Sequence, residues 1–270
     1  YYEFFRLCNE VDDNLITKSG LVDETDPKYD ISTPTGEKAL LAAIDKFRTF
    51  IDNNAVDYNV QFFDNYNYTV YIPTNDALKA AIEKGLPTWE SIQEDYEKCD
   101  KNDDGSLKNE VDKLRLQYKI TYLTNFVRTH FADKTFFADK SDANVEQITS
   151  SYNNDNGLFV KAFARRSNGQ LQVKDNTETG KWLNAVYTTA EGRDVKNIMT
   201  CDRECNSKVK DQSMNGKTVV ATSYAVVHLV DGVLNHVQLS EDGTYPDFQK
   251  EAEEAEGKAA RAYIQKFAIR

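Results

Sequence analysis

The sequence predicts an α+β fold, in which helices dominate the first half of the chain and short strands the second. Three observations support this class. Apolar residues recur at helical spacing in segments 37–53 and 110–130. Short apolar segments alternate with polar turns between residues 159 and 199. In addition, segments 68–72 and 225–230 are rich in β-branched residues, which favour strands.

Four amphipathic helices are predicted, followed by a helical tail. Apolar side chains share one face of each helix. Pro87 and Thr88 favour a helix start, and Gly85 favours a helix end. The predicted helices are Glu37–Asn53, Ala77–Lys84, a segment from Trp89 to Cys99, Glu110–His130, and the Ala- and Glu-rich tail Tyr245–Arg270.

The segment Tyr68–Leu78 predicts a strand, a tight corner and a capped helix. Val70 and Ile72 alternate with neighbours that suit a half-buried strand. Pro73 cannot donate a backbone hydrogen bond and is therefore expected to end the strand. The next three residues favour helix caps, so we expect corner and capping roles for Thr74, Asn75 and Asp76. The corner carries no Gly-x-Ser-x-Gly nucleophile motif.

The segment after residue 224 predicts a β-hairpin. Ala225–Val230 is nearly all apolar, which indicates a central strand that is covered on both faces. Asp231 and Gly232 favour a two-residue turn, and Val233–Leu239 is expected to return as the second strand. In this arrangement we expect His228 to be partly buried and hydrogen-bonded.

Further short strands are predicted between residues 141 and 218. Asn168 and Gly169 form a hairpin-turn pair between the first two of them. The predicted strands are Phe159–Ala164, Leu171–Val173, Trp182–Tyr187 and Val195–Met199.

The segments Tyr68–Leu78 and Ala225–His236 resemble the two signature boxes of the fasciclin domain family. Between them, a predicted helix ends at His130, as a helix does in that family. The resemblance runs from about Tyr2 to Leu239, and it implies a wedge of two β-sheets with helices packed around it, enlarged by insertions. The long insertions are similar to those of fasciclin domains in surface lipoproteins of Gram-negative bacteria.

Length and composition agree with one folded unit. The chain has 270 residues, of which 40% are hydrophobic, and this is typical of a globular domain. The resemblance implies a single domain over residues 1–240 and a C-terminal helical extension over 241–270. The insertions lie near 19–36, 96–112 and 141–215.

The family resemblance predicts a non-enzymatic, extracellular adhesion or binding module that engages a protein or a glycan at the cell surface. The alternative is a calcium- or carbohydrate-binding accessory protein. A formal net charge of −11 disfavours nucleic acid, because neutralising phosphates needs a basic surface. We expect an extracellular or outer-membrane location, with membrane attachment only through a lipid anchor outside this sequence. No cofactor is expected other than calcium.

Candidate binding residues are histidines and aromatic side chains. Aromatic rings in the strand-rich insertion stack on sugars if they are exposed, or else fill the core of the sheet. A hydrolase ranks third and would need His236 and Asp231 to join the other histidines. The candidate binding residues are His130, His228, Tyr152 and Trp182, with Phe159 and Tyr187 as further aromatic candidates.

The segment Asp100–Leu107 matches the first eight positions of a calcium-binding loop. Oxygen-bearing side chains stand at ligand positions, and Gly105 stands at position six. Position twelve carries Val111, where a bidentate acid is expected. An ordinary turn between two helices is the alternative. The possible calcium ligands are Asp100, Asn102, Asp104 and Ser106.

The chain has four cysteines, and the sequence does not fix whether they form disulfides. Cys201 and Cys205 lie four residues apart and could form a small disulfide loop in an oxidising compartment. Free thiols are the second alternative. A zinc site would need Cys8 and Cys99 to converge on the other pair.

Overall fold

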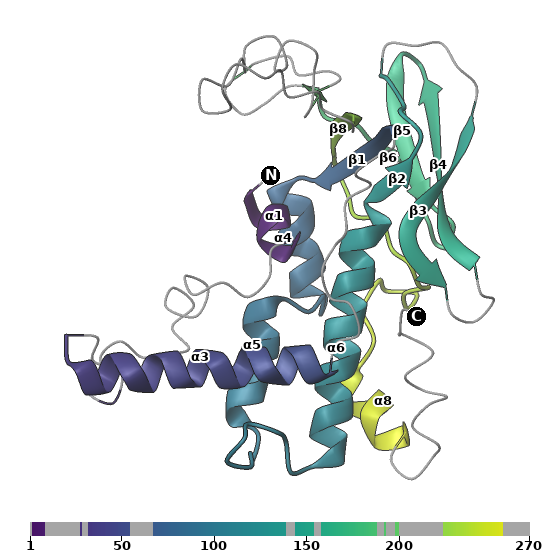
Figure 1. Ribbon diagram of the computed structural model, residues 1–270. Coiled ribbons are helices and arrows are strands. Elements are labelled where there is room, and N and C mark those ends of the chain that lie inside the picture. Colours follow the sequence, from purple (N-terminus) through teal and green to yellow (C-terminus); the bar gives the residue numbers. More distant parts are fainter. Residues whose placement is uncertain are drawn as a thin grey trace, which may run out of the picture.

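The computed structural model describes residues 2–8, 28, 32–54, 67–138, 144–153, 158–187, 192, 198–199 and 224–255. Within these ranges, helices occupy one side of the molecule and a β-sheet occupies the other (Figure 1). The predicted α+β class is therefore confirmed. Across the same ranges, no helix is both long and apolar enough to cross a bilayer.

The four predicted amphipathic helices are present, with boundaries that shift by a few residues. Thr88 and Ser91 form a capping box at the start of α5, each side chain accepting a hydrogen bond from the other's backbone N–H. Gly85 follows α4 with a φ of +103°, a conformation that favours glycine. The helices are α1 (Tyr2–Cys8), α3 (Pro34–Asn54), α4 (Asn75–Glu83), α5 (Trp89–Lys98), α6 (Glu110–Thr129) and α8 (Phe248–Ala255).

The described strands form an eight-stranded sheet in the order β6-β5-β4-β3-β2-β1-β8-β7. The pairing of β1 with β8 is parallel, and the other pairings are antiparallel. The strands are β1 (Asn67–Pro73), β2 (Phe131–Asp133), β3 (Val145–Asn153), β4 (Leu158–Ser167), β5 (Gln170–Asp175), β6 (Leu183–Asn184), β7 (Ile198–Met199) and β8 (Tyr224–Val230).

The two sheets expected from the resemblance are joined into one continuous sheet. The long strand β3 links both halves: Thr149 pairs with Ala132 of β2, while the ends of β3 pair with β4. The sheet also curls back on itself. Ala185, which follows β6, bridges Val230 of β8, and Val186 N–H donates to Leu229 O at 2.7 Å. The result is a nearly closed, barrel-like sheet.

The predicted hairpin after β8 is also wrong. β8 ends at Val230, and residues 233–239 form no strand. The reason is that both edges of β8 are already occupied, by β1 on one side and by β7 and Ala185 on the other. Two backbone N–H groups of the following segment are hydrogen-bonded to side chains instead. Leu234 N–H donates to His130, and Asn235 N–H donates to Asp175.

Buried side chains form two clusters, one on each face of β1. Tyr68, Val70 and Ile72 join the core shared with the helices, whereas Tyr71 points into the curled sheet. This two-sided burial explains why the strand is almost continuously apolar. Small side chains from neighbouring strands fill the interior of the curled sheet: Ala132, Ala162, Ala164 and Ala185.

The C-terminal extension packs onto the helical core over its described part. Phe248 of α8 lies edge-on to Tyr122 of α6, with ring centroids 5.4 Å apart. Ala252 and Ala255 belong to the same buried cluster. Helix α8 is therefore part of the same hydrophobic core as helices α3 to α6.

Candidate functional site

The two signature segments become neighbouring parallel strands. The register runs from Asn67 opposite Tyr224 to Pro73 opposite Val230. Directly after β1, Thr74 N–H donates to Val230 O at 2.9 Å. These contacts place the corner of the first segment against the end of the second.

Thr74, Asn75 and Asp76 shape the start of α4. Thr74 is the N-cap, and its hydroxyl oxygen accepts a hydrogen bond from Ala77 N–H at 3.2 Å. Asn75 and Asp76 are exposed in the first turn, where an acidic side chain interacts favourably with the helix dipole. The corner residues therefore have structural tasks.

Asp231 ties β8 to β6 across the closure of the sheet. Its carboxylate accepts hydrogen bonds from the backbone N–H of Asn184 at 2.7 Å and from the Asn184 side-chain amide at 2.8 Å. Gly232 lies beside Leu183, so closely that a Cβ at this position would be 2.4 Å from Leu183 Cδ2. Glycine is thus favoured here by close packing.

His228 is a buried histidine of the central sheet. It is 3% exposed, and its Nε2 lies 2.6 Å from Phe136 O, so Nε2 carries the proton and donates. Burial lowers the pKa of this imidazole, although the hydrogen bond to Phe136 opposes the shift. The ring lies parallel to that of Tyr71, whose hydroxyl donates to Gln147.

His130 joins the end of α6 to the segment after β8. It is fully buried, and its Nδ1 lies 2.9 Å from Phe126 O. Its Nε2 accepts a hydrogen bond from Leu234 N–H at 3.1 Å. These two contacts require the tautomer with the proton on Nδ1. Burial lowers the pKa of His130 to about 4, so the ring is neutral at pH 7.

His236 is buried close to His130, but its ring has different surroundings. The ring is 4.4 Å from that of Tyr122 between centroids. Within the described residues, neither ring nitrogen has a hydrogen-bond partner. Burial, with a smaller contribution from His130, lowers the pKa of His236 to about 3.

Asp231, His228 and His130 do not form one hydrogen-bond network, as a hydrolase site would need. Asp231 bonds to Asn184, His228 bonds to Phe136, and His130 bonds to Phe126 and Leu234. Each of these side chains has a structural partner of its own.

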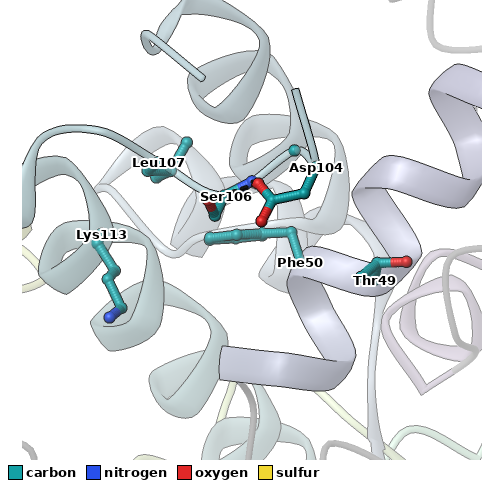
Figure 2. A pocket seen from close by; sticks show the side chains of 7 residues that line it. Thr49, Phe50, Asp104, Ser106, Leu107 and Lys113 are labelled. Carbon is teal, nitrogen blue, oxygen red and sulfur yellow. Dashed lines mark hydrogen bonds between the residues drawn. The ribbon is translucent and has the colours of Figure 1, made fainter. Parts of the chain in front are cut away.

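The predicted calcium loop is a compact turn between α5 and α6. Figure 2 shows Asp104 and Ser106 side by side above Phe50 of α3. These three residues line a cavity of about 380 Å³. Ser106 donates to Asp104 Oδ1 through both its backbone N–H and its hydroxyl, and these bonds lower the pKa of Asp104. Asn102 in turn donates to the Ser106 hydroxyl at 2.9 Å.

These contacts explain the loop as an Asx turn. Among the described residues, no group of three or more His, Cys, Asp or Glu side chains could hold a metal ion. Asp100 is exposed, and Val111 at position twelve is a buried residue in the first turn of α6. Calcium binding stays a prediction, which calorimetric titration with Ca²⁺ would test.

The aromatic candidates separate into inner and outer positions. Tyr187 accepts a hydrogen bond from Leu171 N–H at 2.7 Å and packs against the interior cluster. Phe159, in contrast, is 53% exposed. Trp182 stacks on the guanidinium of Arg165, 3.8 Å from the ring centroid. For Tyr152 the backbone is placed opposite Phe159 in the pairing of β3 with β4.

The cysteine pair Cys201 and Cys205 lies outside the described residues. Cys8 and Cys99 are free thiols. Burial raises the pKa of Cys8 to about 12, so its thiol stays protonated near neutral pH.

Sequence reasoning missed the cations that accompany Trp182. Lys174 Nζ lies 5.4 Å from the Trp182 ring centroid and 5.7 Å from that of Phe163. Strand alternation was the available signal, since Phe163 and Arg165 share one face of β4 and Lys174 lies on the same face of β5. The stacking of Trp182, which lies outside the strands, had no such signal.

The chain matches no protein-family model. A comparison with curated proteins also found no match. Among solved structures, the chain is similar to a FAS1 domain pair from the insect cell adhesion molecule fasciclin I, with 10% identity and a TM-score of 0.34. The match covers 84% of this chain and 56% of the other, so the chain spans little more than half the length of that structure. A likeness at this level assigns neither a family nor a function.

Proposed function

We propose that this chain is a fasciclin-like, non-enzymatic binding module that holds an anionic glycan at a cell surface. The observation that carries the proposal is the stacking of Trp182 with the cations Arg165 and Lys174. Together with Phe163, these residues form the basic aromatic face of β4 and β5.

The alternation of the strands directs this face away from the interior of the curled sheet. Ala162 and Ala164 of β4 are fully buried, and Phe163 and Arg165 alternate with them. Arg165 Nε donates to Gln172 at 2.9 Å, which holds the guanidinium in place on the neighbouring strand. The face is therefore prearranged, and a ligand would lose little entropy in ordering it.

Charge favours an anionic ligand. Among the described residues, neither Arg165 nor Lys174 is ion-paired with a carboxylate. The chain as a whole has a net charge of −11 and therefore repels anions overall. The two cations of this face attract an anion locally. Aromatic rings next to cations suit a sugar ring that carries carboxylate or sulfate groups.

Binding to immobilised polysaccharides tests the proposal. We expect a sulfated polysaccharide and a polyuronate to bind at low salt and a neutral dextran to bind more weakly. The double substitution Arg165→Gln with Lys174→Gln should weaken binding about tenfold or more. Trp182→Ala should weaken it as well. Binding should fall as salt rises, because exposed charges are screened.

A matched control separates this face from overall charge. Lys79→Gln with Lys98→Gln removes the same two charges from exposed positions on α4 and α5. This pair should leave binding near the wild-type level. Equal losses in both double variants, or equal binding of the neutral dextran, would contradict the proposal.

A further inference from the structure

A row of hydrogen-bonded side chains crosses the outside of the sheet from β4 to the end of β8. Arg165 Nε donates to Gln172 Oε1 at 2.9 Å, and Gln172 Nε2 donates to Asn184 Oδ1 at 2.8 Å. Asn184 Nδ2 donates to Asp231 Oδ2, also at 2.8 Å. Arg165 pairs with Gln172 across β4 and β5, and Gln172 pairs with Asn184 across β5 and β6, so these side chains share one face of the sheet. We call the four residues the amide row.

The two ends of the amide row fix the orientation of both amides between them. A carboxylate only accepts hydrogen bonds and a guanidinium only donates them, whereas an amide does both. Asp231 therefore attracts the NH₂ group of Asn184, and the Asn184 oxygen is left for Gln172. The Gln172 amide in turn directs its oxygen to Arg165. A reversal of either amide, or of both, would set two donors or two acceptors against each other.

Asp231 is anchored by backbone contacts at its end of the row. Its Oδ1 accepts a hydrogen bond from the backbone N–H of Asn184 at 2.7 Å. Its own backbone N–H donates to Asn184 O at 3.0 Å. These contacts belong to the closure of the curled sheet. The amide row therefore connects a firmly held carboxylate to a cation of the basic aromatic face.

Trp182 and Gln172 together determine which part of the Arg165 guanidinium meets a ligand. The indole of Trp182 covers one face of the guanidinium, and Gln172 occupies its Nε–H. Within the described part of the chain, the donors left for a ligand are those of the two terminal nitrogens. Side by side, these nitrogens match two oxygens of a carboxylate or a sulfate. Without Gln172, the guanidinium would be free to rotate away from this orientation.

The amide row orients Arg165 without neutralising it. A carboxylate directly beside the guanidinium would also orient it, but it would form an ion pair and oppose an anionic ligand. Strands β5 and β6 lie between β4 and Asp231. Neighbouring strands are ~4.8 Å apart, so the carboxylate lies about 14 Å from Arg165 along the sheet. Charges at the surface are largely screened beyond ~8 Å at physiological salt. The cation therefore keeps its attraction for an anion.

We infer that Gln172, Asn184 and Asp231 are positioning residues of the glycan site, which act through Arg165 by presenting its two terminal nitrogens to a carboxylate or sulfate group of the ligand. This inference rests on the proposed glycan-binding function. It gives Asp231, a residue of the second signature segment, a role beyond the closure of the sheet.

Binding of the full chain to an immobilised polyuronate and to a sulfated polysaccharide tests the inference. Asn184→Ala breaks the row without a change in charge and should weaken binding about fivefold, as expected when one hydrogen bond is lost. Asp231→Ala should weaken binding by a similar factor. Charge alone predicts the opposite for this variant, because removal of a negative charge favours an anionic ligand. The control Asp103→Ala removes the same charge from the exposed turn before α6 and should leave binding near the wild-type level.

A double-variant cycle shows whether the effect passes through Arg165. Asn184→Ala should weaken binding in the wild-type background but not further in the Arg165→Gln background. NMR supplies a readout that needs no ligand. The Nε–H of Arg165 should exchange with water faster in Asn184→Ala than in wild type, because its acceptor is no longer held in place. If Asn184→Ala folds poorly in urea unfolding, Gln172→Met, which removes the acceptor itself, replaces it in each comparison.

Three outcomes separate this inference from the proposed function. Unchanged or tighter binding in both Asn184→Ala and Asp231→Ala overturns the inference and leaves the proposed function standing. An equal loss from Asn184→Ala in the wild-type and Arg165→Gln backgrounds also overturns it, because the effect would then not pass through Arg165. If the wild-type chain binds neither polysaccharide, the proposed function fails and the inference fails with it.

Discussion

His130 and His236 lie close together in the fold, and both are buried and neutral, yet their surroundings differ. His130 uses both ring nitrogens in hydrogen bonds, to Phe126 and Leu234. His236 has no hydrogen-bond partner within the described residues, and it lines a cavity. The contrast teaches that burial and a lowered pKa do not by themselves indicate function. The distinguishing property is whether the protein itself satisfies the group.

The largest predicted effect is the loss of His130. In His130→Ala, Leu234 N–H would lose its acceptor, and the rings of Phe4 and Phe126 would face a cavity. We expect the free energy of unfolding to fall by about 4 kcal/mol. Urea unfolding followed by circular dichroism measures it. A loss below about 1 kcal/mol would show that His130 does not join α6 to the segment after β8.

Acid should destabilise the protein through these same histidines. The folded-state pKa values, about 4 for His130 and about 3 for His236, lie below the ordinary value of 6.5. The unfolded chain therefore binds more protons, so stability is complete above about pH 6.5 and is lost as the pH falls toward 4. We expect His130 alone to account for about 3 kcal/mol of this loss.

Urea unfolding at several pH values between 7 and 4 measures this dependence. The comparison of wild type with His236→Phe cancels the carboxylates that both proteins share. The variant should lose less stability in acid, because one fewer neutral imidazole is buried. Identical pH profiles for the two proteins would mean that His236 becomes protonated in the folded state near its ordinary pKa.

Sequence patterns predicted helices α3 to α6 and strands β4 and β5 because their inward residues are apolar. In β5, Leu171 and Val173 point inward and alternate with polar residues. Strand β3 lacks this pattern and was not predicted. Its inward residues are polar and hydrogen-bonded: Gln147, Thr149 and Ser151. Ile148, meanwhile, faces outward and is 42% exposed. Periodicity cannot reveal a strand whose buried face is made of partnered polar groups.

The site was only partly predictable for a related reason. Local patterns identified Thr74 as a cap and His228 as a buried sheet residue. The hairpin failed because the neighbours of β8 come from distant segments, which no local pattern specifies. The partnership of Asp175 with Asn235 is equally non-local. The surroundings of His236 could therefore be seen only in the folded chain.

Asp175→Asn should destabilise the protein less than His130→Ala. Asp175 holds the segment after β8 that contains both Leu234, the partner of His130, and His236. Asparagine keeps one acceptor oxygen but faces a backbone N–H with its own NH₂ group, either at Thr177 or at Asn235. We expect a loss of about 2 kcal/mol in urea unfolding. A matched control is Asp247→Asn, at an exposed position before α8, which should cost less than about 1 kcal/mol.

The smallest predicted effect is that of His236→Phe, and it is the sharpest test of the contrast. Phenylalanine keeps a ring against Tyr122 and removes two buried nitrogens that have no partner within the described residues. Replacing an unsatisfied polar group with an apolar one of similar shape is nearly neutral or stabilising, so we expect a change within about 1 kcal/mol at pH 7. Thermal and urea unfolding measure it. A loss as large as that of His130→Ala would mean that His236 is a second structural histidine.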